Sequence, residues 1–206
     1  MYLPKDFAVE ERETLFGLIR DNSFGILVSQ VDGVPFASHL PFLLEGDMLV
    51  AHMARANPQW QGFAEGGDVL CVFQGPHAYV SPSWYTVENA VPTWNYAAVH
   101  VYGKPQVVED AEAAYADQEK LVDAYETAFE EPWRLGDRDR GFVDGMARAV
   151  VNFRIPITRI EGKFKLSQNR AEEDRENVIA ALDGSGDPSA VACGALMAAL
   201  KSSSIS

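Results

Sequence analysis

The stretch from Pro76 to Tyr102 carries the residue types best suited to ligand chemistry. It reads PHAYVSPSWYTVENAVPTWNYAAVHVY and mixes flat rings with hydroxyl and amide groups, including Trp84 and the run Thr93, Trp94, Asn95. A plain buried strand would instead alternate apolar and polar residues or consist of Val, Ile and Leu. A tryptophan can stack on a ring system, and an asparagine can pair with its amide-like edge. The composition therefore suits a pocket for a planar ligand, with two aromatic strands packing a barrel as the equal alternative.

A second candidate site is the run HMARANP at residues 52–58. The pattern predicts a strand that ends near His52 and a helix that begins near Pro58. With Arg55 close to the start of a helix, a phosphate site is physically reasonable. The alternative is an ordinary strand-to-helix connection, with Asn57 as the N-cap and Pro58 at the first helical position. The two interpretations are compatible.

A third candidate site follows from the charge pattern. The sequence is strongly acidic over residues 109–131, but residues 154–170 are mostly basic. Strand alternation places Lys163, Lys165 and Ser167 on one face, and Gln168 extends the run with a neutral hydrogen-bonding group. Two ammonium groups on one face repel each other unless an anion lies between them. This indicates a local anion site, and the alternative is a solvated strand edge protected by lysines.

Other kinds of chemistry find little support in the sequence. The two cysteines, Cys71 and Cys193, form no C-x-x-C pair, which argues against a structural disulfide or a cysteine-based zinc site. No P-loop, G-x-G-x-x-G or G-x-S-x-G motif occurs. The four histidines lack metal-site spacing, so no metal is predicted. They are His39, His52, His77 and His100.

Charge and hydropathy limit the partners. The 206 residues carry a formal net charge of −13, which argues against direct DNA binding because that affinity comes from Lys and Arg at phosphates. No apolar run approaches the length needed to span a bilayer, and the N-terminus is acidic where a signal peptide is basic. We therefore expect a soluble, cytoplasmic protein.

The elements that must position these residues are mainly short strands. Turn signals at Asp32-Gly33 and at Glu45-Gly46-Asp47 separate apolar segments and predict a β-meander. Helical periodicity covers residues 9–21, about 111–129, about 141–149 and about 171–182. The predicted fold class is mainly β with peripheral helices, a β-barrel of α+β type. The predicted domain is 1–183, with inserted helices at about 109–149, and residues 184–206 form a weakly ordered Ala/Ser/Gly-rich tail.

Several long blocks, in order along the chain, resemble one known family. They are YLPKDF, ASHLPFLL, HMARANPQW, FQGPHAYVSPSWY, VPTWNYAAVHVYG and ITRIEGKFKLSQNR. Together they resemble the FMN-binding negative transcriptional regulators, or PaiB family, from residue 1 to about residue 182. The resemblance implies an FMN-binding split barrel, similar to the pyridoxamine phosphate oxidase and flavin reductase families. It also implies a homodimer with FMN sites at the subunit interface.

The resemblance also suggests which residues contact FMN. The segment from His52 to Asn57 corresponds to the phosphate turn, with Arg55 as the ion-pair partner. Here Ala54 and Ala56 flank Arg55, whereas oxidases of the superfamily have more Arg and Ser in this turn. The full set of implied FMN contacts is Ser38, His39, His52, Arg55, Asn57, Trp84, Thr93, Trp94, Asn95, Lys163, Lys165 and Gln168.

Three functions are open at this point. The first is an FMN flavoprotein that carries out redox chemistry, as an FMN-dependent oxidoreductase, or senses a small molecule. The second is a transcriptional regulator acting through DNA or a protein partner, although no helix-turn-helix with a basic recognition helix is found. The third is a haem-binding or haem-degrading split barrel, with one of the histidines as axial ligand. The sequence identifies neither a catalytic residue nor an electron donor.

Overall fold

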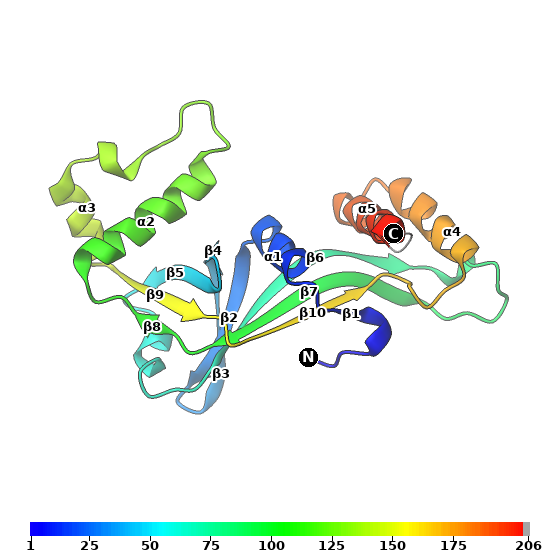
Figure 1. Cartoon of the computed structure of the whole chain (residues 1–206), viewed down its shortest axis with the longest axis horizontal. Helices are drawn as coiled ribbons and strands as arrows, with labels where there is room; N and C mark the ends of the chain where they lie inside the picture. The colour runs from blue at the N-terminus through cyan, green and yellow to red at the C-terminus, as the bar shows by residue number, and fades with distance from the viewer. Residues whose placement is uncertain (204–206) are drawn as a thin grey trace. The chain divides into compact units, whose positions relative to one another are not determined.

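The computed structural model describes residues 1–203 and divides into two compact units. The first unit comprises residues 1–18, 74–99 and 161 onward, and the second comprises residues 19–73 and 100–160. Each unit is built on antiparallel strands with helices added (Figure 1). Three strands contribute residues to both units: β6 (Val69–Val80), β7 (Thr93–Gly103) and β10 (Arg159–Lys165).

The first unit contains four neighbouring strands in the order β1-β10-β7-β6. Strand β1 (Ala8–Val9) follows the short 3-10 helix η1 (Lys5–Phe7) and pairs with β10 (Arg159–Lys165), with Val9 opposite Gly162. Helix α1 (Arg12–Asp21) begins in this unit and buries Leu15. A Cβ added at Gly162 would lie 2.1 Å from the Leu15 Cδ2 atom, so only glycine lets α1 approach this strand so closely.

Two C-terminal helices complete the first unit. Helix α4 (Glu172–Asp183) confirms the helix predicted at about 171–182, and it packs against α5 (Pro188–Ser203) (Figure 1). The prediction of a weakly ordered tail from residue 184 is wrong for this segment, because Cys193 and Met197 of α5 are fully buried. The sequence did not predict this helix because its small residues give only a weak helical hydrophobic period. Residues 204–206 of the predicted tail lie outside the described residues.

The second unit contains two sheets. In the first, part of β6 pairs with β2 (Phe24–Val31), which pairs with β3 (Val34–Pro41). Asp32 and Gly33 join β2 to β3 with positive φ angles of 52° and 76°, which confirms the predicted hairpin turn. The second sheet has the order β4-β5-β9-β8. Its strands are β4 (Leu43–Glu45), β5 (Met48–Ala54), β9 (Val150–Pro156) and β8 (Gln106–Val107).

The predicted inserted helices are confirmed in the second unit as α2 (Ala111–Glu126) and α3 (Arg140–Ala147). Asp110 caps α2 by accepting a hydrogen bond from the backbone N–H of Ala113. Two hydrogen bonds of 2.7 and 2.8 Å join the Arg154 guanidinium on β9 to the carboxylate of Asp117, which holds α2 against the sheet. Three further 3-10 helices are η2 (Pro58–Gly62), η3 (Pro82–Trp84) and η4 (Leu135–Asp137).

The predicted fold class, mainly β with peripheral helices, is confirmed by these sheets and helices. Apolar side chains form the core of the second unit, where the Phe63 and Phe153 rings meet edge to face at 5.1 Å and Phe42 and Phe73 at 5.4 Å. Among residues 1–203, no helix combines the length and apolar character that a membrane crossing requires.

Candidate functional site

Three of the predicted cofactor residues meet in the first unit around the Lys165 side chain. Its Nζ atom donates hydrogen bonds to the Thr93 hydroxyl and, at 2.6 Å, to the Trp94 backbone carbonyl. Burial lowers the pKa of Lys165, and the nearby charges of Lys163 and Arg170 lower it further. The Lys165 ammonium is therefore partly buried in the field of two other positive charges, which an anion would offset.

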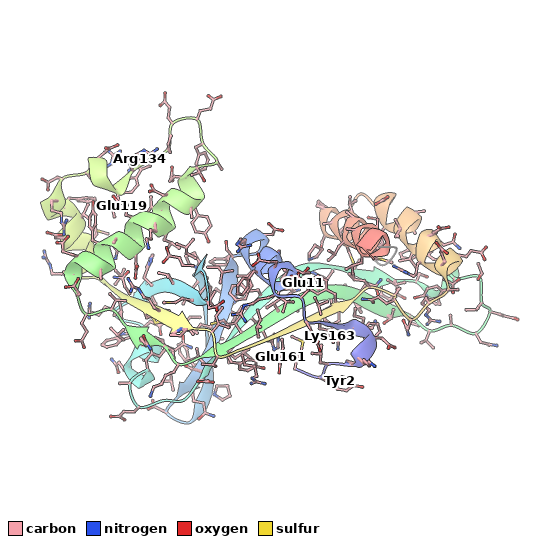
Figure 2. The ribbon with its side chains drawn as sticks, in the orientation of Figure 1. Tyr2, Glu11, Glu119, Arg134, Glu161 and Lys163 are labelled. Atoms are coloured by element: carbon pink, nitrogen blue, oxygen red, sulfur yellow. The ribbon has the colours of Figure 1, made fainter. Side chains whose placement is uncertain are left out.

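Lys163 is more enclosed than its neighbour on the strand. Its side chain is only 9% exposed, and its Nζ donates a 3.1 Å hydrogen bond to the backbone carbonyl of Tyr2. The same ammonium lies 5.3 Å from the Tyr2 ring and 5.6 Å from the Tyr96 ring, within the range of cation–π attraction. Figure 2 shows Tyr2, Glu161 and Lys163 together where the N-terminal segment meets β10. Lys163 is thus occupied by contacts within the chain.

An exposed aromatic surface lies next to Lys165. The Trp94 side chain is 54% exposed and that of Tyr79 is 47% exposed, and their rings meet edge to face at 6.0 Å. The His77 ring lies 6.2 Å from the Trp94 ring. His77 and Tyr79 were not among the predicted contacts, although residues two positions apart on a strand share a face. Together these rings present flat apolar area on β6 and β7.

The side chains of two other predicted FMN contacts in this unit form hydrogen bonds within the protein. Asn95 is fully buried, and its Nδ2 donates to the Ser167 hydroxyl at 2.9 Å and to the Met197 sulfur at 3.3 Å. The Gln168 side chain bridges the backbone, accepting from the Leu166 N–H and donating to the Phe164 carbonyl. These bonds support the turn at Ser167, whose φ is 63°. Trp84 lies in η3 and is half-buried.

The second unit brings Ser38 and Asn57 together. The Asn57 Nδ2 donates a 2.8 Å hydrogen bond to the Ser38 hydroxyl, and its Oδ1 accepts from the Gln59 N–H at 3.0 Å. Asn57 is therefore the predicted N-cap, with Pro58 at the start of η2. The Gln59 side chain, which the sequence analysis missed, donates to the Leu27 carbonyl and to other acceptors on β2 and β3. This network fixes the end of the predicted phosphate turn.

Arg55 connects the same turn to the second sheet. Its Nε donates to the Arg148 carbonyl at 2.9 Å and its Nη2 to the Val150 carbonyl at 2.8 Å. Its own carbonyl accepts from the Trp60 indole at 2.9 Å. Among the residues that the structure describes, only Nη1 of this guanidinium has no partner.

The two predicted histidines have different surroundings. His39 is exposed, and its ring lies 6.3 Å from that of Phe24. His52 lies on β5 directly opposite Asn152 of β9. Burial lowers the pKa of His52, because removing the imidazolium from water disfavours its charged form. The neutral imidazole is therefore the stable form in the folded chain near neutral pH.

The chain is similar in sequence to a known family and in fold to several solved structures. Residues 1–159 match a family model described as "Putative FMN-binding domain". The chain is 40% identical over 201 residues to "Protease synthase and sporulation protein PAI 2" of Bacillus subtilis, covering 96% of each chain. It is also 31% identical to an uncharacterized protein of Emericella nidulans, covering 90% of this chain and 92% of that one.

Two solved structures share the fold at low sequence identity. The flavocytochrome Anf3 from Azotobacter vinelandii gives a TM-score of 0.59 at 17% identity, covering 82% of this chain and 75% of that chain. The FAD and haem binding protein from Mycobacterium smegmatis gives a TM-score of 0.58 at 21% identity, covering 81% and 78%. At these identities the likeness concerns the fold.

Proposed function

Because this chain belongs to the PaiB family of FMN-binding negative transcriptional regulators, we propose that its FMN serves redox chemistry or the sensing of a small molecule. The family assignment also makes the fold an FMN-binding split barrel with FMN as the cofactor. The observation that carries the proposal is the Lys165 ammonium, which donates to the Thr93 hydroxyl and to the backbone carbonyl of Trp94, a residue whose ring is exposed. The motif blocks of the sequence predicted both this family and this cofactor.

The side chains around Lys165 fit the chemistry of FMN. The cofactor combines a flat ring system with negatively charged groups, and the first unit offers exposed Trp94 and Tyr79 rings and, bonded to the Trp94 backbone, the Lys165 ammonium. When bound, FMN supplies the hydride and electron transfer that amino acids cannot perform. Lys165 would hold negative charge at the flavin, and Trp94 would wall its ring. Asn95, by contrast, has a structural role, because its amide is fully bonded inside the chain.

The second group of proposed cofactor contacts is the turn from His52 to Asn57 together with Ser38 and His39. The free Nη1 of Arg55 supports a phosphate contact here. Homodimerisation with cofactor sites at the subunit interface, and a cytoplasmic location, are further parts of the proposal. A regulatory role through a protein partner or a metabolite fits the net charge of −13 better than direct DNA contact.

A titration tests the role of Lys165. FMN is added to the purified protein, and quenching of its fluorescence gives the affinity of wild type, Lys165→Ala and Lys104→Ala. Loss of the ammonium should weaken FMN binding at least about tenfold, or about 1.4 kcal/mol. Lys104 is an exposed lysine between β7 and β8, so its removal tests the effect of net charge alone. Equal affinities for the two variants would mean that Lys165 does not contact the cofactor.

A further inference from the structure

A cavity of about 660 Å³ lies in the second unit, where α2 and α3 face β8 and β9. This volume is within the range of pockets that bind small molecules. One part of its wall is apolar and aromatic, and Arg55 is the only predicted FMN contact in the lining. The apolar and aromatic lining residues are Trp60, Val107, Val108, Ala111, Ala114, Tyr115, Ala147, Val150 and Val151.

At one side of the cavity an arginine and two carboxylates form ion pairs with one another. Arg140 donates 2.8 Å hydrogen bonds to the carboxylates of Glu112 and Asp144. Its guanidinium also lies over the Tyr115 ring, 4.3 Å from the centroid. These contacts hold α3 against α2 and leave Arg140 little capacity for a ligand.

At the other side the cavity presents hydrogen-bond donors that lack partners. Asn152 is only 6% exposed, and its Oδ1 accepts a 3.2 Å hydrogen bond from Gln118. Within residues 1–203 its Nδ2 has no acceptor. The atom is not fully buried, so a ligand can reach it. The Arg148 guanidinium likewise has no ion-pair partner in the described part of the chain, and the Nη1 of Arg55 is unbound. Asn152 is largely withdrawn from solvent, so an acceptor from a ligand in the cavity would complete its hydrogen bonding.

We propose that this cavity binds a small organic anion with a flat or apolar body and one carboxylate. The carboxylate accepts hydrogen bonds from the Asn152 Nδ2 and the Arg148 guanidinium, and the body lies against the valines, alanines and rings of the wall. Glu109 also lines the cavity and has no arginine partner among the described residues, so it opposes the anion. The proposed carboxylate contacts, Asn152 and Arg148, are not among the proposed FMN contacts, although Arg55 also lines the cavity. Separate FMN titration of the same samples distinguishes failure of one proposal from failure of the other.

The ligand class is tested with three probes on the full chain, with and without FMN. Benzoate, its neutral analogue benzamide and the aliphatic anion octanoate are titrated by isothermal calorimetry. Benzoate should bind about tenfold more tightly than benzamide, because only the anion satisfies Arg148. The proposal is overturned if neither anion binds at concentrations up to about 10 mM, or if benzamide binds as tightly as benzoate.

The location is tested with matched variants whose folding is checked by thermal melting. Arg148→Ala should weaken benzoate binding about tenfold. Arg138→Ala removes the same charge outside the cavity, where the guanidinium lies 5.1 Å from the Trp133 ring, and should leave the affinity unchanged. Glu109→Gln should tighten binding, because it removes the opposing charge. If both arginine variants weaken binding equally, or if Glu109→Gln has no effect, the anion does not occupy this cavity.

Discussion

At the scale of single residues, the burial of His52 has a consequence for pH. Because its folded-state pKa is lowered, the unfolded chain takes up a proton first as the pH falls below about 6.5. The contribution of neutral His52 to stability is therefore complete above that pH and is lost as the pH falls through the lower folded-state pKa. We expect the melting temperature of the wild type to fall more steeply between about pH 7 and pH 5 than that of His52→Gln.

The exposed His39 provides the matched control for this measurement. His39→Gln should keep the steep pH dependence of the wild type, because it leaves the burial of His52 unchanged. If His52→Gln melts with the same pH profile as the wild type, protonation of His52 is not coupled to folding.

Single residues also show where sequence reasoning succeeds. The alternation around Lys163 and Lys165 predicted two neighbouring ammonium groups, and the structure places their charges close enough to interact. Asn95 and Gln59 were harder to interpret, because a polar side chain in an apolar segment can face a ligand or bond inside the protein. Only the tertiary structure shows that Asn95 bonds to Ser167 and that Gln59 joins β2 to β3.

At the scale of elements, the ion pair between Asp117 and Arg154 fixes α2 on the second sheet. Asp117 is 2% exposed and its partner is 35% exposed, so the charges are partly screened by solvent. Replacing Asp117 by Asn keeps the shape but removes the charge, and should lower the free energy of unfolding by about 1.5–3 kcal/mol. Urea unfolding followed by circular dichroism measures this change.

The pair between Lys120 and Glu45 is a control that joins the same helix to β4. Its side chains are 52% and 35% exposed, so Lys120→Ala should lower the free energy of unfolding by less than about 1 kcal/mol. Equal losses in the two variants would show that burial does not strengthen the Asp117 pair.

The elements themselves were predictable to different degrees. Strands and α2 carry clear hydrophobic periods or capping residues, so their places followed from the sequence. Helix α5 did not, because its alanines, serines and Gly194 give little periodicity. Gly194 allows a close approach, since a Cβ there would lie 3.3 Å from the Leu182 Cβ. Close packing of small residues stabilises this helix, and such packing gives no clear hydrophobic pattern in a single sequence.

At the scale of the whole molecule, the net charge of −13 governs encounters with other polyanions. We expect no measurable binding to a labelled DNA duplex by fluorescence anisotropy, with or without FMN, between about 50 and 200 mM salt. The 17 Lys and Arg residues are outnumbered by 30 Asp and Glu residues, whose negative charge repels the DNA phosphates. Binding that falls steeply with salt would instead support direct regulation of transcription.

The contact between Asn95 and Met197 has a consequence for oxidation. Met197 is fully buried where α5 contacts Asn95 of β7, whereas the Met146 side chain is 59% exposed. Peroxide can therefore convert Met197 to its sulfoxide only when the helix separates from the strand, but can attack Met146 at any time. The amount of Met197 sulfoxide relative to Met146 sulfoxide, measured by mass spectrometry, therefore reports how often this helix opens. If ligand binding lowers this ratio, the ligand stabilises the packing of the C-terminal helix.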